Sequence, residues 1–411
     1  MKRKLLNQML NEWRPNIWLV LELVIVVCVL YALFSSLYST YLIYNRSEGM
    51  ELNDVYFASL NFIEEDNENH APYDSIHSPE TDYALLLANL RSNPYVEVVG
   101  GGSPNSLPYL YNYWGTQIEI PQKGDRTRLQ YQVNKRQMSP DMLRVLRIHG
   151  VDGQSPDELA ELIAKGDIII SDRDYHNDPS EAKVDDFLGK DVYFYKDSLQ
   201  THHVGAIAYG MRRSDFEPMW SGNLYMNINF SDIKYVGIRV KPGTGHLFAE
   251  SLSESDMQVG NLYLSDLKSI EDMRYSAQIE KYQDIRNKII FAVFVLMVIF
   301  LGFLGSFWFR TQQRASEIAI RKVSGASDRA IYTRFFGEGM ILLAVSIVLA
   351  LPLIYGLSKT EMPGGWMLDV TQAATAGICT VLILAILIVA GIYAPALKAT
   401  RIDIAEVLKN E

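Results

Sequence analysis

The chain has 411 residues, of which 48% are hydrophobic, and its formal net charge is −10 at pH 7. Residues 45–285 hold 38 acidic and 22 basic residues, a net charge of −16, and the remainder has a net charge of +6. This pattern argues against nucleic-acid binding, which needs a basic surface on the folded domain. It fits an acidic domain outside the cytoplasm with basic loops inside.

Cysteine placement argues against several chemistries. The two cysteines, Cys28 and Cys379, both lie inside apolar runs, so the polar region has no pair to form a disulfide. Neither has the spacing of a zinc or redox site. We expect no cofactor and no metal on this chain.

The N-terminus has the pattern of an interfacial helix over residues 1–15, with basic residues at its start that place it inside the cell. Residues 16–44 predict the first transmembrane helix. A cleaved signal peptide is the competing interpretation. We disfavour it because the apolar run is far longer than a signal sequence needs and no clear cleavage site closes it.

A large polar region follows, and its mixed periodicity predicts an α+β domain outside the cytoplasm over residues 45–265. The segments 79–94, 139–150 and 155–166 read as helices; the last two open with a capping serine and end at a glycine. Alternating or apolar runs predict the strands. The expected strands lie in 55–63, 95–102, 106–120, 167–171, 184–195, 202–210 and 233–243.

From Leu264 to Arg286 the pattern becomes helical, and no proline precedes the uncharged run 289–309. About 20 apolar residues in a helix cross a bilayer. We therefore expect residues 266–310 to be one helix, with the second transmembrane helix at its end. Its outer part would be a stalk.

A short basic segment joins this span to the next. Residues 310–334 carry six basic and two acidic residues, which places the segment in the cytoplasm. Good helix formers predict a helix within residues 311–328, with Gly325 as a left-handed stop and Ser327 as the cap of the next helix. Such a helix suits docking on a soluble partner; a solvated basic loop is the alternative from spacing alone.

The same segment carries a recognisable motif. The string R-x-x-E-I-x-I-R-K-x-x-G-A-S closely resembles the segment after the second span in the MacB/FtsX-like permeases of ABC transporters. In that family the segment is the coupling helix that sits on the partner ATPase. The residues that the resemblance implies in ATPase coupling are Arg314, Glu317, Ile318, Ile320, Arg321, Lys322, Gly325 and Ser327.

The rest of the chain continues this resemblance. Residues 329–357 predict the third transmembrane helix, 358–372 an external loop and 373–394 the fourth transmembrane helix. Residues 395–411 form a cytoplasmic tail resembling the family's C-terminal signature, with Ile404 where a proline is usual. The fold class is thus a four-span helical membrane protein with an α+β domain between the first two spans.

The charged residues Glu22, Arg334 and Glu338 lie within the predicted spans. Ionisable groups in a membrane are costly and usually paired. We expect Arg334 and Glu338 to pair at i, i+4, and Glu22 to reach lipid headgroups or Arg329. A proton relay is unsupported, because two isolated carboxylates do not form a chain across the bilayer.

No Walker A string occurs, so ATP hydrolysis is expected on a separate ATPase subunit and this chain is not expected to be an enzyme. The resemblance implies a plasma-membrane permease subunit with both termini inside, export of a drug, peptide or similar cargo, and a homo- or heterodimer of permease chains. A periplasmic adaptor and an outer-membrane tunnel are further partners it allows. The alternatives are an FtsX-like signalling subunit that regulates an extracytoplasmic hydrolase, and a lipoprotein-releasing permease.

The run 172–178 alternates acidic residues and a histidine. A calcium loop of the EF type needs Gly at its sixth position and Glu at its twelfth, and here these are Asn177 and Lys183. A solvated turn is the favoured interpretation. His202 and His203 are neighbours on a predicted strand, so they point to opposite faces and do not share a metal.

Overall fold

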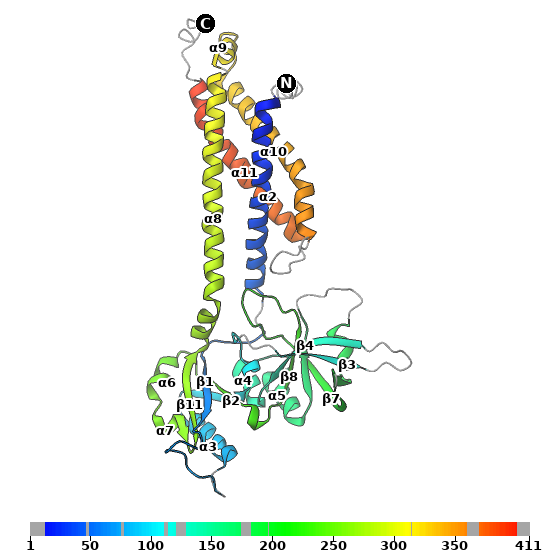
Figure 1. The fold of residues 1–411 in the computed structure, drawn as a ribbon, viewed down its shortest axis with the longest axis vertical. Helices are drawn as coiled ribbons and strands as arrows, with labels where there is room; N and C mark the ends of the chain where they lie inside the picture. Colours follow the sequence, from blue (N-terminus) through cyan, green and yellow to red (C-terminus); the bar gives the residue numbers. More distant parts are fainter. Residues whose placement is uncertain are drawn as a thin grey trace. The chain divides into compact units, whose positions relative to one another are not determined.

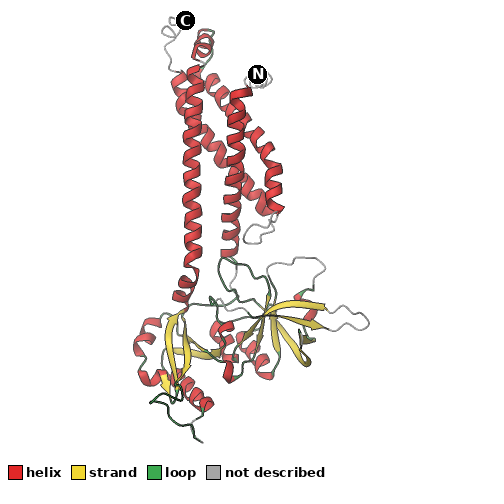
Figure 2. Ribbon diagram, in the orientation of Figure 1, coloured by secondary structure: helices red, strands yellow, loops and turns green. Residues whose placement is uncertain are grey.

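The computed structural model describes residues 13–46, 49–74, 78–110, 114–120, 129–173, 182–195, 197–313, 315–359 and 370–400. The chain forms two compact units, one of residues 43–281 and one of the residues before and after that range. We call them the large domain and the helical unit. Figure 1 colours them along the sequence and Figure 2 separates helix from strand.

The helical unit contains four helices that are long and apolar enough to cross a membrane. They are α2 (Trp13–Tyr44), α8 (Ile270–Gln313), α10 (Asp328–Lys359) and α11 (Val370–Thr400), and the first turns of α8 belong to the large domain. The most apolar window of each has a mean hydropathy between 2.3 and 2.8. The predicted four spans are therefore confirmed. A short helix, α9 (Ala315–Val323), lies between α8 and α10 in the sequence.

Close helix packing builds the core of the helical unit, with buried side chains from all four long helices and from α9. Gly391 of α11 lies against α8, because an added Cβ would come within 3.0 Å of the Cβ of Phe303. Gly339 of α10 lies similarly against Ile388 of α11. Small residues allow helix backbones to approach in a membrane, where packing replaces the hydrophobic effect.

The large domain contains a five-stranded sheet and a closed barrel. The sheet has the order β10-β11-β1-β9-β2, and its paired strands are antiparallel. Its strands are β1 (Val55–Phe62), β2 (Val96–Gly102), β9 (Tyr235–Val240), β10 (Gln258–Val259) and β11 (Leu262–Ser269). The helices α3 (Pro79–Ser92) and α6 (Gly245–Ser251) bury leucine and phenylalanine side chains against it. Another short helix, α7 (Glu254–Met257), precedes β10.

The barrel has the order β3-β4-β8-β5-β7-β6 and closes through β3 and β6. Two of its pairs, β4 with β8 and β5 with β7, are parallel. Its strands are β3 (Gly115–Ile120), β4 (Leu129–Gln137), β5 (Ile168–Ser171), β6 (Asp191–Phe194), β7 (Asp197–Ala208) and β8 (Gly222–Met226). Closure leaves the barrel without free edges.

Two helices, α4 (Pro140–Leu146) and α5 (Pro156–Lys165), lie between the sheet and the barrel (Figure 1). Their buried side chains join Phe57 of β1 and Ile169 of β5 in one apolar cluster. Three 3-10 turns complete the domain: η1 (Pro104–Ser106), η2 (Val184–Phe187) and η3 (Phe230–Asp232). The α+β fold predicted between the first and second spans is confirmed.

The structure corrects the predicted start of the long helix. Helix was expected from Leu264, but residues 262–269 form strand β11, which pairs with β1. Leu262 and Leu264 are buried at alternate positions, as a strand facing the core requires. The helix begins at Ile270, where the Oγ of Ser269 accepts a hydrogen bond from the backbone N–H of Asp272 at 3.1 Å.

Other expected elements are shorter than predicted. The helix predicted to end at Gly150 ends at Leu146, because Arg147 takes a left-handed conformation with φ of 48°. In the segment 184–195 the first four residues form the 3-10 turn η2, and only Asp191–Phe194 form a strand. In 106–120 the strand covers Gly115–Ile120.

Candidate functional site

The predicted coupling segment contains the helix α9, which has one buried and one exposed apolar face. Ile318 is buried in the core of the helical unit, with 5% of its surface exposed. Ile320 and Val323 are 54% and 65% exposed, and Arg321 beside them is also exposed. The helix is therefore fixed to the spans through Ile318 and presents apolar side chains next to a charge on its other side.

The end of α9 has the predicted stop and cap. Gly325 has a φ of +86°, a conformation that side chains other than glycine rarely adopt, and the backbone N–H of Ala326 donates to the carbonyl of Arg321 at 3.0 Å. Ser327 opens α10: its carbonyl accepts from the N–H of Ala330 at 2.9 Å, and its Oγ accepts from the same group at 3.4 Å.

An ion pair crosses this turn, since Lys322 Nζ lies 3.0 Å from Asp328 Oδ1. Arg314 and the side chain of Glu317 lie outside the described residues. The shape of the segment agrees with a docking helix, and the docking role of its residues stays a prediction.

The charged residues of the spans are placed as follows. Arg334 Nε lies 3.5 Å from Glu338 Oε1, and the side chains are 14% and 3% exposed, so the expected i, i+4 pair is present. Glu22, which was expected to reach headgroups or Arg329, lies against Gly302 of α8. Its Oε1 is 3.0 Å from the position that a Cβ at Gly302 would take, so the carboxylate lies close to the backbone of α8.

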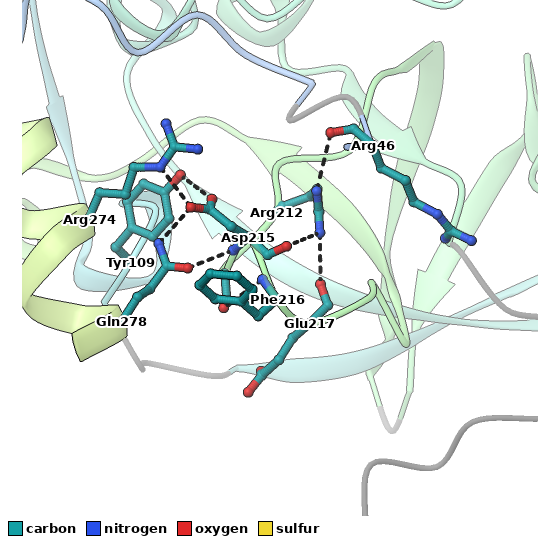
Figure 3. A network of polar contacts seen from close by, with 9 residues as sticks. Arg46, Tyr109, Arg212, Asp215, Phe216, Glu217, Arg274 and Gln278 are labelled. Carbon is teal, nitrogen blue, oxygen red and sulfur yellow. Dashed lines mark hydrogen bonds and ion pairs between the residues drawn. The ribbon is translucent and has the colours of Figure 1, made fainter. Parts of the chain in front are cut away.

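A second candidate feature, which the sequence did not indicate, is a buried carboxylate in the large domain. Asp215 is 2% exposed. Its Oδ1 accepts from the hydroxyl of Tyr109 at 2.9 Å, and its Oδ2 accepts from Arg274 Nε at 2.7 Å and Gln278 Nε2 at 2.9 Å. Arg274 and Gln278 lie four residues apart on the first turns of α8, so one face of that helix is fastened to Asp215 (Figure 3).

The neighbouring Arg212 extends this network to the segment after the first span. Its guanidinium is buried, with 3% of the residue exposed, and donates to three backbone carbonyls (Figure 3). These belong to Arg46 at 3.3 Å, Asp215 at 2.9 Å and Glu217 at 3.3 Å. The ring of Tyr44 also stacks on Phe216, with 5.5 Å between the ring centres. Residues 212–217 thus hold both chain segments that connect the large domain to the spans.

Sequence reasoning missed this network because its signal is not local. Arg212 and Asp215 are two charged residues in a polar stretch, which reads as a solvated turn. Two partners of Asp215, Tyr109 and Arg274, are more than 50 positions away from it in the chain. Only the fold brings these groups together.

The remaining polar candidates do not converge on a metal. Of the run 172–178, residues 174–178 lie outside the described residues. His203 Nδ1 lies 3.1 Å from Asp191, whereas His202 stacks on Phe194, so the two histidines have different partners. Within the described ranges, no three His, Cys, Asp or Glu side chains are grouped to hold a metal ion.

The C-terminal part of the chain resembles a known family of permeases. Residues 289–404 match the family described as FtsX-like permease, C-terminal. This stretch is similar to the C-terminal domain of FtsX-like permeases. It includes the apolar part of α8, the helix α9 and the last two spans, and it confirms the resemblance to the MacB/FtsX-like permeases of ABC transporters. The chain is accordingly a multi-pass membrane protein.

Two further comparisons complete the findings. Among solved structures, the chain is similar to the extracellular domain of the noncanonic ABC-type transporter YknZ from Gram-positive bacteria. The sequence identity is 11%, the match covers 51% of this chain and 100% of that one, and the TM-score is 0.30. A search of curated proteins found no match.

Proposed function

We propose that this FtsX-like permease chain couples ATP hydrolysis on a separate ATPase subunit to movement of its large domain outside the cytoplasm. The observation that carries the proposal is the FtsX-like match over residues 289–404, within which α9 joins two spans and exposes Ile320 and Val323. An exposed apolar pair next to Arg321 is the composition expected of a small protein interface.

In this proposal α9 receives the movement of the ATPase. Its anchor is Ile318, which is buried among the spans, so a push on α9 is passed to the helices around it. The turn at Gly325 and the pair of Lys322 with Asp328 make the connection to α10 short and ordered. The side with Ile320 and Val323 is left for the partner.

Helix α8 would carry the movement onward, because it is one continuous helix from Ile270 to Gln313. At its beginning, Arg274 and Gln278 bind the buried carboxylate of Asp215. A displacement along α8 would therefore act on the loop that contains Asp215. This is mechanotransmission: the nucleotide cycle on one side of the membrane does work on a domain on the other side.

The proposed setting is a bacterial inner membrane with both termini in the cytoplasm, supported by the basic residues around α9 and the acidic large domain. We propose that the chain pairs with a second permease chain and exports a drug, peptide or similar cargo. Catalysis of ATP hydrolysis would lie on the partner, which binds the ATP. A periplasmic adaptor and an outer-membrane tunnel would complete an export system.

The test changes the exposed side of α9. Val323→Glu places a carboxylate on the proposed interface, and we expect it to weaken ATPase binding at least tenfold and to lower ATP hydrolysis by the assembled complex. The chain is purified in detergent with the ATPase that copurifies with the unaltered chain, and binding and hydrolysis are measured. Val151→Glu is the matched control, because Val151 is also an exposed valine, at 49%, but lies in the large domain.

Normal ATPase binding and normal hydrolysis by the Val323→Glu complex would remove α9 from the coupling mechanism. The proteins that the full chain captures distinguish export from regulation of an enzyme. An adaptor supports export, whereas a cell-wall hydrolase would replace export by regulation of that enzyme.

A further inference from the structure

A cavity of about 80 Å³ lies in the large domain beside the parallel strands β4 and β8. Asn134 and Arg136 of β4 line it, opposite Asn223 of β8 and the segment that precedes β8. The remaining lining residues are Met211, Arg213, Glu217, Pro218, Met219, Trp220 and Ser221.

The cavity contains a buried positive charge with neutral partners. Arg136 is 3% exposed; its Nε donates to Asn223 Oδ1 at 2.8 Å and its Nη1 donates to the carbonyl of Asn105 at 2.5 Å. Burial lowers the pKa of Arg136 to about 10; Tyr225 opposes this shift and Arg213 adds to it. The guanidinium is still charged at neutral pH. Buried charges are normally paired, so a cavity beside this one suits an anion.

The acidic residue in the lining, Glu217, does not neutralise Arg136. Glu217 lies 3.2 Å from Arg213 Nη2 through Oε2 and 3.4 Å from Lys281 Nζ through Oε1, so both of its oxygens face other cations. Within the described residues, no ion pair joins a carboxylate to Arg136. The positive charge is therefore left for a group that enters the cavity.

An acceptor beside it also lacks a partner. Asn134 Oδ1 is buried and has no hydrogen-bond partner in the described part of the chain. Such groups are rare in folded proteins, since a buried acceptor loses its hydrogen bonds to water without gaining others. A ligand with an N–H or O–H donor next to its anionic group would satisfy both Arg136 and Asn134.

Part of the lining is apolar, and one of its residues is partly exposed. Met211 and Met219 provide thioether side chains, and Trp220 is 45% exposed. A cavity of about 150 Å³ holds a benzene ring, so the smaller volume here admits a carboxylate with its neighbouring atoms and leaves the rest of a larger ligand outside. Methionine and tryptophan side chains suit an apolar group at that position.

We infer that this cavity binds the carboxylate end of an acylated amino acid or a peptide. The carboxylate accepts from Arg136, the adjacent amide N–H donates to Asn134 Oδ1, and an apolar side chain packs against Met219 and Trp220. This site is independent of the proposed coupling, because it needs neither the ATPase nor α9.

The test uses the full chain in detergent micelles and calorimetric titration. The probes are N-acetyl-L-methionine and its neutral carboxamide, N-acetyl-L-methioninamide. We expect saturable binding of the acid and at least tenfold weaker binding of the carboxamide, because only the acid has a charge for Arg136. A tripeptide that ends in methionine is the second arm. Tighter binding of the tripeptide assigns the site to peptide ends, and tighter binding of the acetylated amino acid assigns it to small molecules.

Variants locate the binding. Arg136→Gln and Asn134→Asp should each weaken binding of the acid at least tenfold, the first by removing the charge and the second by adding a repelling one. Arg91→Gln is the control, because Arg91 is exposed and pairs with Asp141 away from the cavity, and it should leave binding unchanged. If Arg136→Gln does not fold, binding of the acid is compared between the parent chain and the variants Asn134→Asp and Trp220→Ala, whose positions are partly exposed.

Three results would overturn the inference. They are equal binding of acid and carboxamide, binding that neither Asn134→Asp nor Trp220→Ala alters, and binding of inorganic phosphate without binding of the acid. The last result would mean that the cavity takes a phosphate group. A failure of ATPase coupling at α9 would not affect any of these measurements.

Discussion

Two buried ionic groups of the large domain, Asp215 and Arg136, have opposite surroundings. Asp215 is 2% exposed and is surrounded by donors: the hydroxyl of Tyr109, the guanidinium of Arg274 and the amide of Gln278. Arg136 is 3% exposed, and its Nε and Nη1 donate to a side-chain amide oxygen and a backbone carbonyl. The first charge is compensated by the fold, and the second is not.

This difference separates a structural group from a candidate binding group. A buried charge with a counter-ion and full hydrogen bonding fixes the elements around it, and removing one partner is costly. A buried charge next to open space and without a counter-ion lowers stability until something binds it. The segment 211–217 contributes to both sites. Arg212, Asp215 and the carbonyl of Glu217 belong to the Asp215 network, and Met211, Arg213 and Glu217 line the cavity.

The largest expected effect comes from Asp215→Ala. The substitution leaves Arg274 and Gln278 without their buried acceptor, and breaking a buried pair in this way costs about 3–5 kcal/mol. We expect a lower unfolding temperature of the full chain in detergent and faster proteolysis near the start of α8. Both are measured on the purified chain, by thermal unfolding and limited proteolysis.

Asp191→Ala is the control for that experiment. Asp191 pairs with His203 at 3.1 Å, but its side chain is 68% exposed, so its removal should cost no more than about 0.5 kcal/mol. Equal destabilisation by the two substitutions would mean that Asp215 does not hold the base of α8.

A smaller effect is expected at the next pair of residues, Arg212 and Arg213. Arg212→Met removes the donors to the carbonyls of Arg46, Asp215 and Glu217, and we expect a loss of about 2–3 kcal/mol in the free energy of unfolding. Arg213→Met removes one partly exposed pair with Glu217 and should cost less than about 1 kcal/mol. Chemical unfolding of the full chain measures both.

These adjacent arginines are a matched pair, because the two side chains have the same volume and nearly the same sequence neighbours. A difference between the two variants therefore reports the contacts that each side chain makes. If Arg213→Met were the more damaging change, the cavity wall and not the Asp215 network would stabilise this segment. The contrast between the two regions would then be reversed.

The membrane part of the fold could be predicted because its signals are local. Span length follows from uncharged runs, and the end of α9 follows from Gly325 with Ser327 two residues later. Each of these features acts within a few residues of its own position. No distant partner is needed to decide them.

The large domain could be predicted only in class, because distant pairing decides its details. Leu264, Leu267 and Ile270 are spaced at a helical period, but pairing of β11 with β1, some 200 residues earlier, makes residues 262–269 a strand. The closed barrel depends on contacts such as β3 with β6. The Asp215 network and the cavity at Arg136 also depend on contacts between residues far apart in the sequence. No local sequence pattern could therefore predict them.

The smallest expected effect tests the same contrast in two uncharged groups. The hydroxyl of Tyr225 accepts from the N–H of Met211 at 2.8 Å and donates to the carbonyl of Tyr209 at 2.9 Å. The hydroxyl of Tyr83 is buried against Gly101 and has no hydrogen-bond partner in the described part of the chain. We expect Tyr225→Phe to cost about 2 kcal/mol and Tyr83→Phe to raise stability by up to about 1 kcal/mol.

The pH dependence of Tyr83→Phe gives a second measurement. Burial raises the pKa of Tyr83 above its ordinary value of 10, so its phenol ionises in the unfolded chain before it does in the folded one. Below pH 10 the phenol is neutral in both states and adds no pH dependence, whereas above pH 10 its ionisation in the unfolded chain lowers the stability of the parent chain. The advantage of Tyr83→Phe over the parent chain should therefore grow by up to about 1.4 kcal/mol per pH unit above 10. A constant difference between pH 8 and pH 11 would show that the hydroxyl is solvated in the folded chain.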